Sequence, residues 1–169
     1  MSEHLTPTPD IRVALVDAAI RAAVLQLGVS DEQHDFVGRI IASLPDAEAC
    51  AGSEPMAILL DGEPIGFYRI ETHPRSIADM DFPRVTLGLR SFFIDTRWQG
   101  RGLGTRALVA AMHDLARRHP SARDVVLTVN LRNAPALALY RRAGFRETGG
   151  LYHGGRSGPQ FVMLCALPV

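Results

Sequence analysis

The chain has 169 residues, carries a formal net charge of zero and is 47% hydrophobic. That length fits one domain over residues 1–169, with its core at about 11–167. The neutral charge predicts neither a nucleic-acid nor a membrane partner. Cys50 and Cys165 lie far apart, without metal-ligand spacing. They predict no metal site and no disulfide framework, and favour a cytoplasmic location.

The first half of the chain predicts one strand, two helices and a hairpin. In chain order, we expect a strand at 11–16 (with a helix as the alternative), a short helix at 17–27, a helix at 30–44, a loop at 52–55 and strands at 56–60 and 65–70. Ser30 and Gln33 form a capping-box pattern that opens the second helix. Asp61-Gly62 is typical of the tight turn in a hairpin.

The second half predicts strands that alternate with helices and then two closing strands. In chain order, we expect a loop at 72–84, a strand at 85–95, a long helix at 103–118, a strand at 124–129, a helix at 134–142 and strands at 145–152 and 160–167. The spacing of Leu108, Ala111, Met112 and Leu115 gives the long helix one apolar face. Residues 153–159 hold three glycines and predict a flexible surface loop.

A glycine-rich turn opens the long helix, with the spacing Q-x-x-G-x-G from Gln99 through Gly102 to Gly104. Such a turn exposes backbone N–H groups at the positive end of the helix dipole, which suits a phosphate or pyrophosphate. A P-loop needs a lysine, and the chain has none. A dinucleotide fingerprint that starts at Gly100 needs glycine where Thr105 stands.

A second segment, V-N-x-x-N-x-x-A-x-x-L-Y-x-x-x-G-F, runs from Val129 to Phe145. Asn133 is a good N-cap residue for the helix that follows. Ala136 and Tyr140 are four residues apart and share one helix face, where the small alanine leaves room for a ligand.

The two segments, in this order, resemble the two cofactor motifs of the GNAT superfamily of N-acetyltransferases. The resemblance implies an α/β (α+β) fold with a mixed sheet of about six to seven strands, helices on both faces and a splayed strand pair that holds acetyl-CoA. It also implies a set of cofactor-binding residues. They are Phe93, Ile94, Gln99, Gly100, Arg101, Gly102, Leu103, Gly104, Thr105, Asn133, Ala136, Tyr140 and Arg142.

Shorter matches at Leu27–Gln33, Phe36-Val37 and Ile65–Phe67 resemble the bacterial polyamine-type acetyltransferases. The resemblance therefore implies transfer of an acetyl group to a primary amine, directly and in a ternary complex, with a small amine such as a polyamine as acceptor. Two alternatives are acetylation of a protein N-terminus, as by ribosomal-protein acetyltransferases, and a non-catalytic acyl-CoA-binding regulator. A homodimer is left open.

Amide formation needs three groups around the thioester. A backbone N–H, from Phe93 or Ile94, stabilises the oxyanion. Tyr140 can protonate the leaving thiolate, because a phenol titrates near 10 and a thiol near 8.5. A base must remove the proton of the amine, and Glu71 is the first candidate. Further candidates to attract or deprotonate the amine are Asp79, Asp81, His73 and His153.

Other charged and aromatic residues near the motifs have simpler expected roles. Arginine forks suit phosphate oxygens, so we expect one or two arginines of the motifs to bind the phosphates of coenzyme A. The candidates are Arg97, Arg101, Arg106, Arg141 and Arg142. We expect Asp31, Glu32 and Asp35 to be a solvated helix start, and Phe92 and Trp98 to be packing residues.

Overall fold

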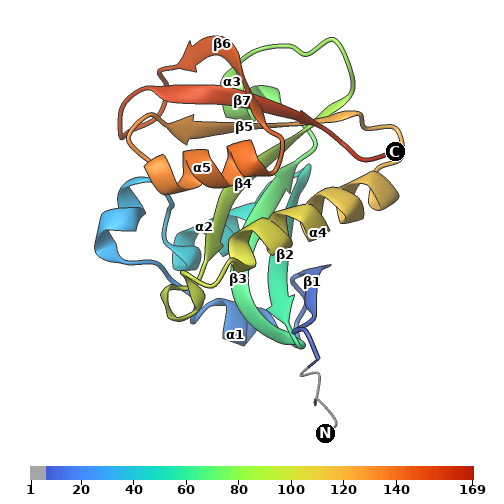
Figure 1. Cartoon of the computed structure of the whole chain (residues 1–169), viewed down its shortest axis with the longest axis vertical. Helices are drawn as coiled ribbons and strands as arrows, with labels where there is room; N and C mark the ends of the chain where they lie inside the picture. Colours follow the sequence, from blue (N-terminus) through green and yellow to red (C-terminus); the bar gives the residue numbers. More distant parts are fainter. Residues whose placement is uncertain (1–6) are drawn as a thin grey trace, which may run out of the picture.

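The structure, a computed structural model, describes residues 7–169 apart from the side chain of Ser76. A seven-stranded sheet runs through the molecule in the order β1-β2-β3-β4-β5-β7-β6, and only the β4–β5 pair is parallel (Figure 1). The strands are β1 (Ile11–Leu15), β2 (Ser53–Leu60), β3 (Glu63–Glu71), β4 (Thr86–Ile94), β5 (Asp124–Asn130), β6 (Arg146–Tyr152) and β7 (Gln160–Ala166). The predicted mixed sheet is confirmed.

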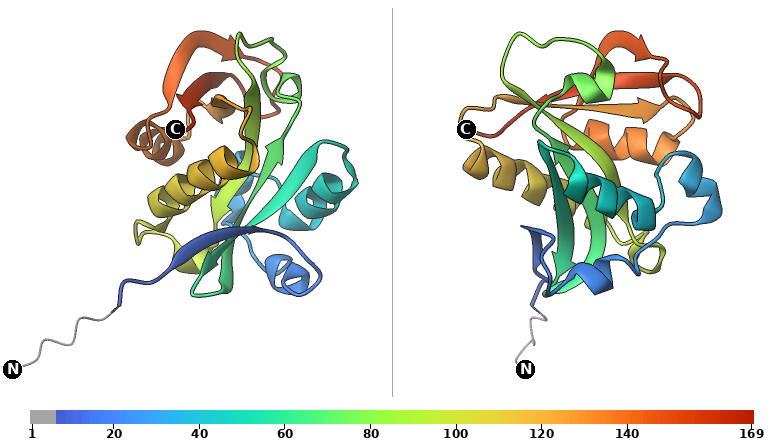
Figure 2. Two further views of the ribbon diagram at one scale, coloured as in Figure 1. Left: turned by 90° about the vertical axis from the view of Figure 1, so that its right-hand side faces the viewer. Right: turned by 180° about the vertical axis from the view of Figure 1, so that it is seen from behind.

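Helices cover both faces of the sheet, as predicted. They are α1 (Arg21–Val24), α2 (Ile40–Ala49), α3 (Arg75–Ala78), α4 (Leu103–Arg118) and α5 (Ala134–Arg142), with the 3₁₀ helices η1 (Asp31–Asp35) and η2 (Thr96–Trp98). Figure 2 shows α4 and α5 on one face and α1, α2 and α3 on the other. The apolar stripe of α4 buries Leu108, Ala111 and Leu115 against the sheet, and Phe67 of β3 packs with Val24 and Leu44 on the opposite face.

The central parallel pair separates soon after it begins. β4 and β5 pair only over Thr86–Gly88 and Asp124–Val126. Beyond this point β4 continues along β3, while β5 continues along β7. The sheet is therefore splayed between β4 and β5, and side chains from both strands face one opening.

A bulge bends β4 inside the splayed part. Phe67 of β3 lies opposite Phe93, but Arg69 lies opposite Arg90, so β4 has one extra residue between these pairs. Ser91, within the bulge, has a φ of 57°, a left-handed backbone conformation that is unusual for a residue other than glycine. The bulge therefore changes the direction of the β4 backbone in the part of the strand that borders the opening between β4 and β5.

The segment at 11–16, for which a helix was the alternative, forms the strand β1. Two other predicted elements near the N-terminus differ from the structure. The helix expected at 30–44 breaks at Gly38 and an extended Arg39, so that η1 and α2 replace it. The helix expected at 17–27 forms only over Arg21–Val24. Its flanking residues instead form turns that lead toward η1.

Two predicted loops contain regular structure. The loop expected at 52–55 is the start of β2, and it tolerates Pro55 because the carbonyl of that residue accepts from Val16 N–H. The missing N–H of Pro55 thus faces the end of β1 and removes no bond to β3. The loop expected at 72–84 holds α3, whose Ile77 packs on Val126 and Val162.

Candidate active site

The glycine turn before α4 has the geometry of an anion site. Gly100 and Gly102 have φ values of 76° and 73°, and a Cβ at either position would meet open space. Gly102 is the N-cap of α4 and provides no side-chain cap. The first N–H groups of a helix of 16 residues therefore lack a side-chain acceptor. This end of α4 fits the pyrophosphate of coenzyme A by charge and by space.

Two polar side chains hold this turn against neighbouring elements. Gln99 donates to the Ile94 carbonyl at 2.7 Å and bonds to the amide of Gln33 in η1. The buried carboxylate of Asp95 accepts from Gly28 N–H at 2.9 Å and from both the backbone and the side chain of Arg97. Burial raises the pKa of Asp95, whereas these hydrogen bonds and the charge of Arg97 lower it. The lowering is the larger effect, so the pKa of Asp95 lies below its usual value.

The second motif forms the start and one face of α5. The Asn133 side chain accepts from Ala136 N–H, and Pro135 occupies the first turn. Tyr140 is 8% exposed and packs edge-on against Phe92 and Phe145, with ring centroids 6.4 and 5.8 Å away. Burial raises the pKa of the Tyr140 phenol. The hydroxyl therefore stays protonated at neutral pH and is available as a donor.

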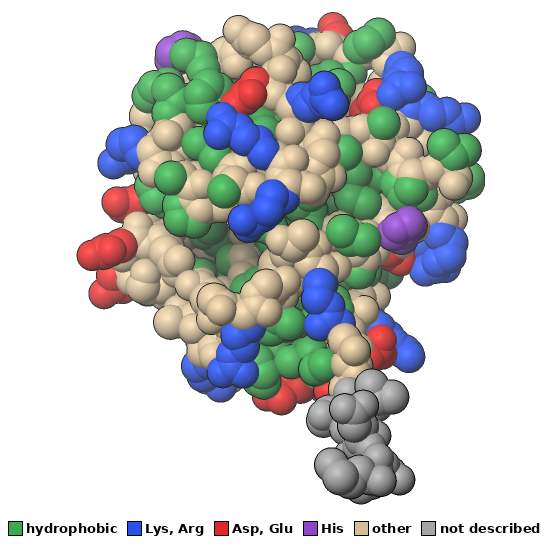
Figure 3. Space-filling view, in the orientation of Figure 1, with side chains coloured by type: hydrophobic (Ala, Val, Ile, Leu, Met, Phe, Trp, Pro, Cys, Tyr) green, Lys and Arg blue, Asp and Glu red, His purple; other side chains and the backbone are tan. Residues whose placement is uncertain are grey.

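A cavity of about 1100 Å³ occupies the opening between the splayed strands. Its walls are Leu89–Phe92 of β4 and Leu127–Asn130 of β5, with residues of α5, of the η1–α2 segment and of the loop between β6 and β7. Figure 3 shows the surface hollowed below α5, beside the start of α4. Among the predicted cofactor residues, Asn133, Ala136 and Tyr140 line this cavity. The glycine-turn residues, Phe93, Ile94 and Arg142 lie outside its lining.

The backbone direction of β4 distinguishes the two predicted oxyanion donors. Asp95 N–H donates to Ile65 O at 2.8 Å, so this residue faces β3. Since successive residues of a strand direct their backbone groups to opposite sides, Ile94 faces away from β3, and its carbonyl indeed accepts from Gln99. The Phe93 carbonyl faces β3, only 2.5 Å from where a Cβ on Gly66 would lie.

Glu71 lies in a buried ion-pair cluster rather than on the cavity wall. Its Oε1 is 2.7 Å from Arg69 Nε and 3.5 Å from Arg90 Nη1, and Ser53 donates its hydroxyl to Oε2. Arg69 also pairs with Asp46 of α2 at 2.6 Å. Both carboxylate oxygens of Glu71 thus lie against protein groups, and Glu71 is not part of the cavity lining. This geometry gives no support to Glu71 as the base.

The other candidates near the acceptor also lie outside the cavity lining. Asp79 and Asp81 are exposed and pair with Arg75 at 3.6 and 2.7 Å. His73 follows the end of β3, and His153 follows β6. The acidic residues that do line the cavity are Asp35 and Asp46. Of the predicted solvated helix start, Asp31, Glu32 and Asp35 are all exposed, and Asp35 also lines the cavity.

The arginines around the two motifs fall into two groups. Arg97 pairs with Asp95, Arg141 with Glu147, and Arg106 donates to the Pro9 carbonyl. Arg101 lies over the Trp98 ring at 5.1 Å. Within residues 7–169, neither Arg101 nor Arg142 is within ion-pair distance of a carboxylate. These two exposed arginines are the candidates for phosphate oxygens that have no carboxylate partner, although Arg101 also donates to the Arg97 carbonyl at 3.4 Å.

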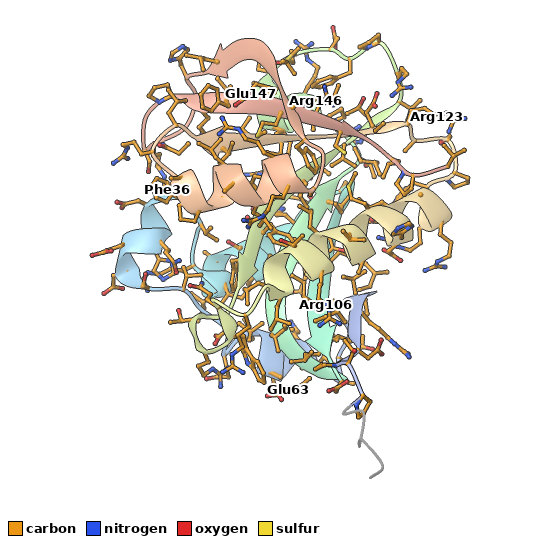
Figure 4. All side chains as sticks on the ribbon, viewed as in Figure 1. Phe36, Glu63, Arg106, Arg123, Arg146 and Glu147 are labelled. Atoms are coloured by element: carbon orange, nitrogen blue, oxygen red, sulfur yellow. The ribbon has the colours of Figure 1, made fainter. Side chains whose placement is uncertain are left out.

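Sequence reasoning missed the acceptor side of the cavity. Residues of η1 and α2 line it, together with Arg69 and Arg90, which lie opposite each other on β3 and β4. At the far end, the Arg132 guanidinium lies over the Phe36 ring at 5.6 Å, and Figure 4 shows Phe36 beside the start of α5. No local motif marks these residues, because four separate elements bring them together.

Residues 7–169 contain no group of three His, Cys, Asp or Glu side chains placed to hold a metal ion. Among the same residues, no helix is long and apolar enough to cross a membrane.

Comparison with known proteins agrees with this geometry. The model of the acetyltransferase (GNAT) family matches residues 15–145. The spermine/spermidine N(1)-acetyltransferase of Bacillus subtilis is 34% identical over 145 residues, which cover 86% of this chain and 93% of that protein. The probable spermine N(1)-acetyltransferase of B. subtilis subsp. natto is 33% identical over the same length and coverage.

Solved structures share the fold at lower identity. Spermidine N-acetyltransferase from Vibrio cholerae, in complex with CoA and spermine, has a TM-score of 0.68 at 14% identity and covers 93% of this chain and 95% of its own. Aminoglycoside acetyltransferase AAC(6')-Ib, in complex with coenzyme A, has a TM-score of 0.70 at 19% identity with the same coverage. The chain therefore belongs to the acetyltransferase (GNAT) family and is an acetyl-CoA-dependent N-acetyltransferase.

Proposed function

We propose that the protein transfers the acetyl group directly to a primary amine of a small molecule, with both substrates bound at once between β4 and β5. The cavity between the splayed strands carries this proposal, because Tyr140, the β4 bulge and the η1–α2 segment all border it. Acetyl-CoA supplies the acetyl group as an activated thioester. The domain that we assign to this function is residues 1–169, with its core at about 11–167.

The protein groups have separate roles in this proposal. The first turn of α4, from Leu103 to Thr105, holds the pyrophosphate, with Arg101 and Arg142 near its oxygens. The Ile94 N–H, which faces away from β3, donates to the carbonyl oxygen where negative charge develops. Tyr140 gives its proton to the departing thiolate.

The base is a different group from the one expected from the sequence. Glu71 is enclosed by Arg69, Arg90 and Ser53, so we assign it the positioning of Arg90 rather than proton transfer. The proton of the attacking amine leaves through water in the open cavity. Asp35, the last residue of η1, is a carboxylate of the cavity lining that has no arginine partner among the described residues.

The relatives support a small amine over the two alternatives. Both Bacillus relatives are named for spermine or spermidine, and both exceed 30% identity over most of each chain. These names favour a polyamine as acceptor. Acetylation of a protein N-terminus and non-catalytic acyl-CoA binding remain the alternatives, and a cytoplasmic location and a homodimer stay predictions.

Incubation of the purified protein with acetyl-CoA and a panel of amines tests the proposal. The panel holds polyamines, simple monoamines, amino acids and peptides with free N-termini, and a reaction without amine is the control. Free thiol and the mass of the product are measured. We expect turnover with small amines; turnover with peptides alone supports the first alternative, and tight coenzyme A binding without turnover supports the second.

A further inference from the structure

The lining of the cavity holds more arginines than carboxylates. Four arginines line it, Arg39, Arg69, Arg90 and Arg156, against two carboxylates, Asp35 and Asp46. Two carboxylates outside the lining also lie near these arginines, since Glu71 contacts Arg69 and Arg90, and Asp31 lies 3.7 Å from Arg39. Asp46 is already 2.6 Å from Arg69. A polyamine carries several positive charges at neutral pH. Among the described residues of the lining, Asp35 is the one carboxylate that is not paired with an arginine and could bind such a charge.

Arg69 and Arg90 form the most unusual part of this wall. They are direct cross-strand partners on β3 and β4, so two positive charges lie opposite each other on one face of the sheet. Like charges in this position destabilise a strand pair. Arg69 is buried and takes the close contacts with both Asp46 and Glu71, at 2.6 and 2.7 Å.

Arg90 is therefore left with donors that face the cavity. Its side chain is 44% exposed, and its only ion pair with a described residue is the 3.5 Å contact to Glu71, which Arg69 holds more closely. A guanidinium has five N–H donors in a planar fork that fits a carboxylate or a phosphate. Arg90 also comes directly before the bulge at Ser91, next to the backbone that faces the reaction.

We infer that the acceptor is a primary amine that also carries an anionic group, a carboxylate or a phosphate, and that Arg90 binds this group. The inference rests on the proposed direct transfer to a small primary amine, and for the acceptor class it replaces the polyamine that the names of the relatives favour. An anion on Arg90 accepts from the donors that the 3.5 Å contact with Glu71 leaves open, and it places the amine beside the β4 bulge. A polyamine in the same place would instead add positive charge beside the two arginines.

Matched pairs of amines test this with the wild-type protein. Each pair differs only in the anionic group: β-alanine with β-alaninamide, and ethanolamine phosphate with ethanolamine. Spermidine is the polycation. We expect kcat/KM for the better anionic amine to exceed that of its neutral partner and of spermidine by about tenfold or more, as a charge-assisted hydrogen bond provides. The two pairs distinguish carboxylate from phosphate.

Variants of Arg90 connect the preference to this side chain. Arg90→Gln is expected to raise KM for the anionic amine about tenfold, with little change for its neutral partner or for coenzyme A affinity. Arg90→Glu is expected to shift the preference toward spermidine. Arg117→Gln is the control, because Arg117 is exposed on α4 and lies outside the cavity lining.

Three results overturn the inference in distinguishable ways. A wild-type protein that prefers spermidine to every anionic amine contradicts the acceptor class and leaves the proposed function intact. An anionic preference that survives in a folded Arg90→Gln protein removes Arg90 from recognition. No turnover with any amine removes the proposed function itself. The wild-type comparison decides the acceptor class even if an Arg90 variant does not fold.

Discussion

At the scale of single residues, Tyr140 combines burial with access to the cavity. Its ring packs between Phe92 and Phe145, and its pKa is raised by burial. A phenol in this state does not ionise at neutral pH, so it serves as a donor rather than as a base. This is the state that protonation of a departing thiolate requires.

We expect Tyr140→Phe to lower kcat by about 10²-fold or more, the usual scale of general acid catalysis. Coenzyme A affinity should change much less, because phenylalanine keeps both ring contacts and an interaction made only in the transition state affects turnover. Steady-state kinetics and calorimetry measure the two effects. Tyr152→Phe, in the same cavity lining, is the control, and an unchanged kcat in Tyr140→Phe would remove the hydroxyl from the mechanism.

A second tyrosine, Tyr68, has a hydroxyl that is buried away from the cavity. Tyr68 is fully buried beside Phe92, and no described residue forms a hydrogen bond with its hydroxyl. An unsatisfied buried hydroxyl costs about 1–3 kcal/mol. Tyr68→Phe should therefore leave the free energy of unfolding unchanged or raise it. Chemical denaturation checks this, and a loss of more than about 1 kcal/mol would indicate a bond to the hydroxyl.

At the scale of elements, the glycine turn and α4 form the site that we propose for the pyrophosphate. Gly102 needs its positive φ of 73°, so a side chain there would strain the backbone even without a ligand. Gly104 has no such constraint, and a Cβ there lies 3.6 Å from Leu139, an ordinary contact. Gly104 therefore separates an effect on the ligand from an effect on the fold.

We expect Gly104→Val to weaken coenzyme A binding by about tenfold or more while the protein stays folded. The branched side chain fills space at the first turn of α4, where the pyrophosphate should approach the backbone. Gly104→Ala is the matched control, because its Cβ makes only an ordinary contact with Leu139. Calorimetry measures both, and near-normal affinity in the valine variant would mean that the turn has only a structural role.

Asp95 joins two elements, since its carboxylate ties the end of β4 to the Gly28 loop and to η2. Its folded pKa lies below the usual value, so its contribution is present above the unfolded pKa of about 4 and is lost as the pH falls through the folded pKa. Asp95→Asn should lose about 1–3 kcal/mol at pH 7.

Denaturation of wild type and Asp95→Asn at several pH values measures that loss, with the exposed Asp31→Asn as control. The difference in free energy of unfolding should shrink below about pH 4, where the wild-type carboxylate itself takes up a proton. A difference that is the same at pH 3 and pH 7 would contradict an ionic role for Asp95.

At the scale of the whole molecule, the local geometry of the two motifs could be predicted from the sequence, and the wall of the cavity opposite them could not. The glycine turn and the Asn133–Tyr140 helix are local patterns, in which spacing alone sets the geometry. The cavity charge depends on Arg69, Arg90 and Asp46, which become neighbours only through strand register and the packing of α2. Glu71 illustrates the limit: its place at the strand end was visible, but its two arginine partners were not.

The same limit explains the errors in the elements. Capping and periodicity favoured one helix at 30–44, but the chain bends at Gly38 and Arg39 so that η1 and α2 can line the cavity separately. The loop expected at 52–55 is instead the start of β2, and Pro55 fits into this strand because its missing N–H faces the end of β1. Tertiary contacts decided both cases.

The central claim is that both substrates occupy the opening between β4 and β5 together and that the acetyl group passes directly between them. Initial velocities over a grid of acetyl-CoA and amine concentrations test it most directly. The account predicts double-reciprocal lines that intersect, as a ternary complex requires. Parallel lines, the pattern of an acetylated protein intermediate that forms before the amine binds, would contradict it.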